Sequence, residues 1–367
     1  MFYGYPTKAT AENWLHNTLV KLVKTLHTNA DQGKPLLIWP DCLPKERREN
    51  LKRRHGFKRR LTEYEGAIRR LSCGERQQVL VCLDAQNKIK ELLAGQQDCD
   101  RLSDLPELAR QPISDLFHFA FELIKELGIR DRHYKLIFDA TEDHYCPFCC
   151  CEPFDAPGGE RFALDSSERR ISEALDHYLP RDEYPFAAAN LCNLVPMGGK
   201  CNGYKLNTDL LRSQSNHRRK AFYPYSKQRS RVCLKSSEPI GRRPTDPPSW
   251  KILIIPTCPE ADTWNEVFSL HTRIERDVLS PARYQRWFKQ FCQWFVKEFK
   301  TWSPTNAQIV AGLKKYHDNE AIKELNGVEH YRTLVIDMIH HHCSKGSSKL
   351  FQRIKATIKE AIPPITQ

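Results

Sequence analysis

The sequence lacks the segments that would carry the protein into or across a membrane. The opening stretch, MFYGYPTKATAENWLHN, has no apolar core followed by a small-residue cleavage site. The longest apolar run beside a predicted strand is ILII at 252–255, which is far too short to span a bilayer. Internal repeats and low-complexity segments are also lacking. We therefore expect a cytoplasmic protein with no membrane partner.

Negative charge is scarce relative to positive charge. The 367 residues contain 57 Lys and Arg against 45 Asp and Glu, which gives a net charge of +12. A basic surface attracts polyanions, nucleic acid first and anionic membranes second. The charged fraction of 28% is that of a soluble globular protein, and the length allows two or three domains. Nucleic acid is therefore a candidate partner.

Cysteine, in contrast, is plentiful, with 14 residues. In a reducing cytosol, isolated cysteines are free thiols packed in a core, whereas clustered cysteines are metal ligands. Only two stretches have the character of sites, YCPFCCCEPFD at 145–155 and the Asp-His-containing stretch at 175–207. We assign the scattered cysteines to packing: Cys42, Cys73, Cys82, Cys99, Cys258, Cys292 and Cys343.

Hydrophobic periodicity predicts a mainly α-helical region over residues 1–135. Apolar side chains recur at helical spacing in AENWLHNTLVKLVKTLH (11–27) and in ISDLFHFAFELIKELG (113–128). In the second segment, Ser114 is the predicted N-cap and Gly128 the predicted stop. Between them, the basic run at 45–60 is compatible both with a solvated helix face and with phosphate contact.

Residues 136–235 form a predicted central domain in which helical periodicity fades, and residues 236–367 a mainly helical C-terminal region. The fold class expected is therefore α+β. In the basic segment at 212–235 we expect the aromatic residues to pack and some of the cations to contact phosphate. The proline-rich stretch at 236–249 is predicted to be a linker, 250–256 a short buried strand, and the aromatic stripe at 280–302 a helix core.

Cys146-Pro-Phe-Cys149 is a knuckle that could bind one zinc ion with two further ligands. A second such knuckle would fall at 198 and 201, but position 198 is Gly198 and only Cys201 is present. The fourth thiolate could come from Cys192, or from one of the cysteines at 150 and 151. A knuckle that binds no zinc is the alternative.

The stretch from Asp176 to Lys205 contains the side chains that metal-dependent phosphodiester hydrolysis requires. His177 can take a proton from water, and Asp176 can hold a divalent cation. Asn193 can grip the loop that carries the histidine, Asn202 offers a neutral oxygen to the cation, and Lys205 can reach a phosphate. Each residue alone is weak evidence, and their combination in this order is strong.

The motifs CPFC, DHYLPRDEYP and NLVPMGGKCNGYK together resemble the HNH endonuclease family, over residues 146–225. The resemblance implies a ββα-metal finger that forms a central nuclease domain, acting on DNA. It is similar to a subgroup with a downstream aromatic element, represented here by Phe222-Tyr-Pro-Tyr225. The sequence departs from the family at Gly198, at Tyr223, where the family has histidine, and in a long insertion at 150–175.

By this resemblance, His177 would be the general base, oriented by Asn193. Asp176 and Asn202 would bind a catalytic Mg²⁺ or Mn²⁺ ion, with Lys205 close by. Structural zinc would be bound by Cys146, Cys149 and Cys201, with Cys192 as the candidate fourth ligand. Asn190 is the rival of Asn193 for the middle position.

The resemblance also implies a biological context and partner proteins. HNH domains framed by helical regions resemble effectors of bacterial anti-phage or restriction systems, which work beside an ATPase or sensor protein, so the outer regions are candidate docking surfaces. One alternative is a catalytically inactive, zinc-stabilised DNA-binding or scaffold module. A thiol redox protein built on CPFCCC is a third hypothesis, but the βαβ pattern that it would need is missing.

Overall fold

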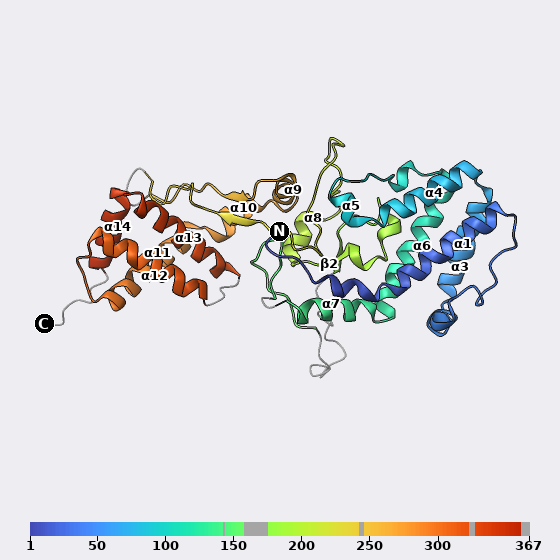
Figure 1. Ribbon diagram of the computed structural model, residues 1–367, viewed down its shortest axis with the longest axis horizontal. Coiled ribbons are helices and arrows are strands. Elements are labelled where there is room, and N and C mark those ends of the chain that lie inside the picture. The colour runs from blue at the N-terminus through green and yellow to red at the C-terminus, as the bar shows by residue number, and fades with distance from the viewer. Residues whose placement is uncertain (142–143, 158–174, 242–245, 323–326, 361–367) are drawn as a thin grey trace. The chain divides into compact units, whose positions relative to one another are not determined.

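The computed structural model describes residues 1–141, 144–157, 175–241, 246–322 and 327–360 (Figure 1). These residues are mostly helical, with two small antiparallel sheets, in agreement with the expected α+β class. Across the described ranges, no helix combines the length and the apolar character needed to cross a bilayer. Contacts divide the chain into two compact units, one of residues 3–146 and 154–228, the other of residues 1–2, 147–153 and 229–367.

The larger unit contains most of the N-terminal helices and the hairpin that carries His177. Its helices α1, α3, α4 and α6 lie side by side in Figure 1. The helices and strands are α1 (Trp14–Asp31), α2 (Arg48–Leu51), α3 (His55–Arg70), α4 (Cys73–Gln86), α5 (Ile89–Leu93), α6 (Glu107–Glu126), α7 (Ile129–Asp139), β1 (Leu175–His177), β2 (Leu194–Pro196) and α8 (Gly199–Lys205).

The helices form where the periodicity of apolar residues predicts them. In α1 the apolar residues Leu15, Leu19, Leu22, Val23 and Leu26 are all buried, which confirms the expected face. Helix α4 begins with a reciprocal capping box, in which Ser72 and Glu75 bond each other's backbone N–H groups.

Helix α6 begins earlier than the sequence predicted. It starts at Glu107 after Pro106, so the predicted N-cap Ser114 lies inside the helix. Pro112 lacks an N–H and leaves the carbonyl of Leu108 without its helical donor, but Leu108 is 51% exposed and water can serve that carbonyl. The predicted stop is confirmed, because Gly128 has the left-handed φ of +64° that ends the helix.

A short antiparallel hairpin followed by a helix occupies the second part of this unit. Strands β1 and β2 pair with Leu175 opposite Pro196, Asp176 opposite Val195 and His177 opposite Leu194. Helix α8 begins three residues after β2 and ends at Lys205. This arrangement is called the β1–β2–α8 finger below.

The finger and the helices share one hydrophobic core. Leu175, Phe186, Leu191 and Leu194 belong to the same cluster of buried side chains as the apolar faces of α1, α3, α4 and α6. The rings of Phe117 and Phe186 meet edge to face with their centroids 4.9 Å apart. This common core explains why the compact units differ from the three predicted regions: residues 3–146 and the finger form one body.

The smaller unit consists of a two-stranded sheet and a set of helices. The sheet pairs Arg231 with Ile255 and Cys233 with Leu253, so the proline-rich stretch at 236–249 connects two paired strands. Its elements are β3 (Arg231–Cys233), β4 (Leu253–Ile255), α9 (Pro259–Phe268), α10 (Leu270–Arg273), α11 (Pro281–Phe299), α12 (Asn306–Ile322), α13 (Val328–Ser344) and α14 (Ser348–Glu360).

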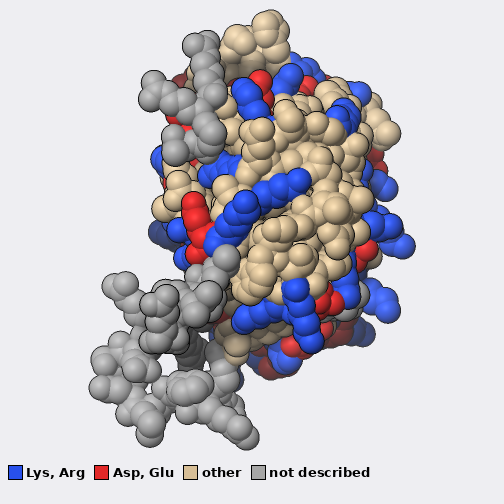
Figure 2. All heavy atoms as spheres, turned by 90° about the vertical axis from the view of Figure 1, so that its left-hand side faces the viewer, with Lys and Arg blue, Asp and Glu red and all other residues tan. Residues whose placement is uncertain are grey.

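Helix α11 buries the predicted aromatic stripe, with Tyr284, Trp287, Phe288, Phe291 and Phe295 all at 2% exposure or less. On the face of this unit seen in Figure 2, Lys and Arg side chains surround a broad area of residues without formal charge. Because its side chains are buried, the aromatic stripe of α11 is part of the core, as expected.

Two buried histidines of α1 make stability depend on pH. Burial lowers the pKa of both His16 and His27 from 6.5 to about 4. Between pH 6.5 and 4 the unfolded chain therefore binds protons that the folded chain does not, so the free energy of unfolding falls as the pH falls. At pH 5, each histidine should reduce stability by about 2 kcal/mol relative to pH 7.5.

Chemical denaturation at pH 7.5 and pH 5 measures this difference. His16→Leu, which removes one titrating group, should reduce the difference by about 2 kcal/mol. An equal free energy of unfolding at the two pH values would contradict the expectation.

Candidate functional site

Four side chains that can bind a metal converge at the cysteine knuckle. Cys146, Cys149, Glu152 and Cys201 each offer one ligand atom, and these atoms lie within 4.8 Å of one another. Tetrahedral zinc with sulfur ligands would place them about 3.8 Å apart, so only a small contraction is needed. The three cysteines are buried and Glu152 is half-buried. This donor set can hold a metal ion and is compatible with zinc.

The fourth member of this group differs from the sequence expectation. Glu152, rather than Cys192, completes the set, and Cys150 and Cys151 are not part of it. The Cys192 thiol instead lies near Tyr223, where the two groups hydrogen-bond. The cysteine pattern predicts a fourth thiolate, but the carboxylate of Glu152, three residues after Cys149, also suits zinc.

His177, at the end of β1, is buried, with 9% exposure. Its Nε2 lies 3.0 Å from the carbonyl oxygen of Ala188. A carbonyl oxygen only accepts, so Nε2 carries the proton and Nδ1 of the neutral ring keeps its lone pair. Burial lowers the pKa of His177 to about 3, which keeps the imidazole neutral at physiological pH. The ring is thus fixed in one tautomer that can accept a proton.

Asn193 clasps the loop that follows His177. Its Oδ1 accepts from the N–H of Leu179 at 2.7 Å, and its Nδ2 donates to the carbonyl oxygens of Leu179 and Ala187 at 3.0 and 3.3 Å. The side chain is fully buried. Asn190, the rival for this position, points elsewhere and bonds to Asn13 and Asn87. The amide that spans both ends of the histidine loop is therefore that of Asn193.

Lys205 occupies a different place from the one expected. Its side chain is 1% exposed, and Nζ donates to the carbonyl oxygens of His177 and Leu206 at 2.6 and 3.2 Å and pairs with Oδ2 of Asp176 at 2.8 Å. Burial lowers the pKa of Lys205, while the Asp176 carboxylate opposes that shift. With its ammonium directed into the finger, Lys205 does not reach a phosphate. The sequence did not reveal this, because a lysine at the end of a helix is usually solvated.

Asp176 and Asn202 lie on the two elements that the finger brings together, β1 and α8. The Asp176 side chain is 20% exposed, and Asn202 is half-buried. A carboxylate and an amide oxygen suit Mg²⁺ or Mn²⁺, which commonly takes one or two protein carboxylates and completes its shell with water and phosphate. In this structure the carboxylate of Asp176 is paired with Lys205.

Arg181 is a cation near His177 that sequence reasoning did not select. Its side chain is 40% exposed, and its guanidinium carbon lies 5.6 Å from the centroid of the Phe121 ring. That ring in turn lies 4.3 Å from the His177 ring. Arg181 forms two long ion pairs, with Glu122 at 3.8 Å and with Asp182 at 4.0 Å. Its signal in the sequence was a cation four residues after the histidine.

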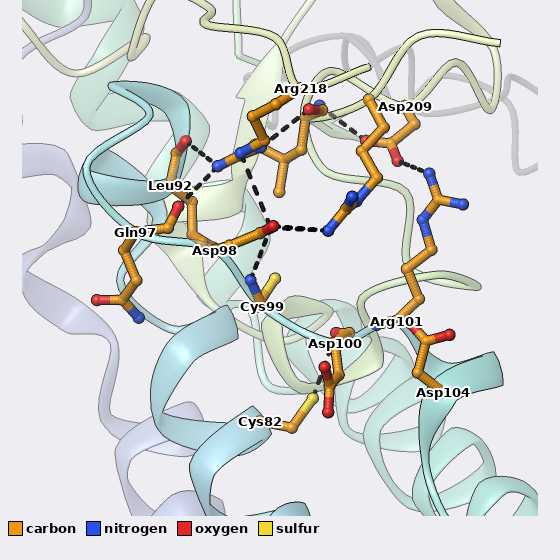
Figure 3. A network of polar contacts seen from close by, with 12 residues as sticks. Cys82, Leu92, Gln97, Asp98, Cys99, Asp100, Arg101, Asp104, Asp209 and Arg218 are labelled. Atoms are coloured by element: carbon orange, nitrogen blue, oxygen red, sulfur yellow. Dashed lines mark hydrogen bonds and ion pairs between the residues drawn. The ribbon is translucent and has the colours of Figure 1, made fainter. Parts of the chain in front are cut away.

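Most cations of the two basic segments are engaged within the protein. Arg218 donates to the carbonyl oxygens of Leu92 and Gln97 at 2.6 and 2.8 Å (Figure 3). Asp98 accepts two bonds from Arg212. In the run at 45–60, four cations pair with carboxylates and two lie over aromatic rings: Arg48, Lys52, Arg54 and Arg59, and Arg47 and Arg60. These cations contact other parts of the protein, so we do not assign them to phosphate contact. The aromatic residues Phe222 and Tyr225 are buried, as expected.

Comparison with models of known protein families, with curated proteins and with solved structures finds no match to this chain. Function is therefore inferred from the geometry of the finger.

Zinc retention can show whether Glu152 or Cys192 is the fourth ligand of the metal group. We expect about one zinc ion per chain in the purified protein, measured by mass spectrometry of the metal content. Glu152→Gln and Cys201→Ser should each lower zinc retention during dialysis against a chelator at least tenfold, as loss of a ligand does. Cys192→Ser is the matched control and should retain zinc like the unmodified chain. Zinc loss in Cys192→Ser with retention in Glu152→Gln would show that the ligand set is wrong.

Proposed function

We propose that the chain is a metal-dependent endonuclease that hydrolyses DNA phosphodiester bonds with an HNH-type finger. The observation that carries the proposal is the state of His177. A neutral imidazole with a free lone pair on Nδ1 stands at the end of a strand, directly after a carboxylate, with its loop clasped by a buried amide. General-base activation of water needs a ring held in this way.

The residues of the finger divide the work of the reaction. His177 accepts the proton of the attacking water at Nδ1, and the carbonyl of Ala188 stabilises the imidazolium that forms, through the Nε2–H bond. Asp176 and Asn202 would bind a divalent cation, which when bound neutralises the charge that develops on the phosphate and the leaving oxygen. Lys205 holds the carboxylate of Asp176 in place. The zinc-compatible group would anchor the start of α8 through Cys201.

The inactive-module hypothesis is weaker for a physical reason. A module that only binds DNA has no need of a carboxylate, an imidazole and a side-chain amide gathered on one finger, whereas metal-dependent phosphodiester hydrolysis uses all three.

Cleavage of a supercoiled plasmid tests the proposal. With Mg²⁺ or Mn²⁺ the protein should relax or linearise the plasmid, and with EDTA it should not. His177→Ala should reduce the cleavage rate by at least about 100-fold, because it removes the general base, and should change the affinity for DNA less than about twofold. A His177→Ala protein that cuts at the original rate would overturn the mechanism. DNA binding without cleavage under either metal would favour the inactive module.

Arg181 is the cation that we expect to bind the substrate phosphate. Lys205 is buried, whereas Arg181 is partly exposed beside the Phe121–His177 pair and has no acidic group closer than 3.8 Å. A guanidinium binds phosphate through two parallel hydrogen bonds, so it would orient the phosphate towards Nδ1 of His177.

Arg181→Gln should lower kcat/KM for cleavage by about 10- to 100-fold, as loss of a charge-assisted phosphate contact does. Arg70→Gln makes the same change of charge at an exposed position of α3 and should leave kcat/KM within about twofold. The two variants are compared at one ionic strength, because salt weakens every phosphate contact. Equal losses in both variants would mean that only net charge matters.

A further inference from the structure

A polar groove of about 700 Å³ lies between α1, α4 and the segment that precedes β2, and neither His177 nor Asp176 lines it. Its walls carry five side-chain amides and two lysines, but only one carboxylate. Lys24 pairs with that carboxylate, Asp84, at 2.6 Å, and among the described residues Lys21 has no acidic partner. A groove of this size and polarity can take a small ligand that presents both hydrogen-bonding edges and negative charge.

Three of the amides are already oriented by a chain of hydrogen bonds at the bottom of the groove. Asn13 donates to Asn190 at 2.9 Å, and Asn190 donates to Asn87 at 3.0 Å. Asn87 in turn donates to the carbonyl of Leu83 at 2.8 Å. Each amide keeps a second N–H, and each has its orientation fixed by these bonds. Amides ordered before binding lose little conformational entropy when a ligand arrives.

His16 is a buried side chain in the wall of the same groove. Its side chain is 3% exposed and lines the groove, and its Nδ1 has no hydrogen-bond partner within the described part of the chain. Burial lowers its pKa to about 4, with the Asn87 side chain opposing the shift, so the ring is neutral at pH 7. Because Nδ1 is enclosed, His16 supports the wall of the groove beside Asn87 and does not offer a free atom to a ligand.

We propose that this groove binds a nucleotide, with the ordered amides contacting the base and Lys21 the phosphate. The acceptor atoms on the edge of a nucleobase can take the second N–H group that each of these amides keeps. An ammonium group beside them matches a phosphate, and Val20 offers an apolar contact for the face of the base. The groove is separate from the metal group and from the His177 site, so this inference does not depend on the nuclease activity.

The bottom of the groove is also part of the loop that fixes His177. The side chains of Asn13 and Asn190 accept the N–H groups of Leu191 and Cys192 at 3.1 and 3.0 Å. The carbonyl of Ala188, which fixes the tautomer of His177, is two residues before Asn190. A nucleotide that orders Asn13 and Asn190 therefore stabilises residues 188–193 directly. Regulation of the finger by the nucleotide is the function that this placement supports, and this step, unlike binding itself, rests on the proposed nuclease activity.

Isothermal titration calorimetry of the full chain tests the proposal, without added divalent cation. The ligands are the four common ribonucleoside triphosphates, their nucleosides, and inorganic tripolyphosphate as a probe of charge alone. At least one triphosphate should bind one-to-one, at least about tenfold more tightly than its nucleoside or tripolyphosphate, because base and phosphate contacts both contribute.

Three variants separate the contacts. Lys21→Gln should weaken the triphosphate about tenfold and leave the nucleoside unchanged, since it removes only the charge. Lys58→Gln, an equal change at an exposed position of α3 outside the groove, should have no effect. His16→Leu should weaken both ligands, and its melting temperature shows whether it remains folded.

Hydrogen exchange gives a second measurement at the bottom of the groove. The bound triphosphate should slow exchange at the amides of Leu191 and Cys192 in the unmodified chain and not in Lys21→Gln at the same concentration. The proposal is overturned if no triphosphate binds saturably, if tripolyphosphate binds as tightly, or if Lys58→Gln loses as much affinity as Lys21→Gln. None of these outcomes bears on cleavage by His177, which the plasmid assay decides.

Discussion

The finger depends on one buried ammonium group, that of Lys205. A charge taken out of water costs several kcal/mol unless it is paired and hydrogen-bonded. The structure meets this cost with three oxygens, from Asp176, from the backbone of His177 and from Leu206, which has a positive φ of 41°. Because two of these oxygens belong to β1 and the lysine ends α8, strand and helix are fixed to each other. The ion pair therefore sets the position of Asp176 and of the residue that follows it.

Two sets of uncharged hydrogen bonds also fix the position of the loop that follows His177. The amide of Asn193 joins the two ends of the loop after His177, and the carbonyl of Ala188, inside that loop, accepts the Nε2 proton. The loop is in turn attached to the helical core through Phe186 and Leu191. Catalytic geometry in this protein would thus be maintained by the N-terminal helices as much as by the finger, since both bury their apolar side chains in one core.

Much of this could be read from the sequence because it depends on local patterns. Apolar spacing predicted the buried face of α1 and the aromatic core of α11, and Gly128 ended α6 where a left-handed residue is needed. The resemblance carried by Asp176, His177, Asn193, Cys201 and Asn202 implied a hairpin followed by a helix, and the structure has these elements. The start of α6 was predicted too late, at Ser114, whereas the helix begins at Glu107 and contains Pro112.

What the sequence by itself determined was the set of elements and the chemical types grouped along the chain, since both follow from periodicity and short spacing. The tertiary structure alone decided which side chains meet. It directed Lys205 inward to Asp176, substituted Glu152 for Cys192 in the metal group, and distinguished Asn193 from Asn190. It also brought Asn13, Asn87 and Asn190 together from three distant segments. These choices depend on burial and on the closing of long loops, and neither is encoded in the spacing of a few neighbouring residues.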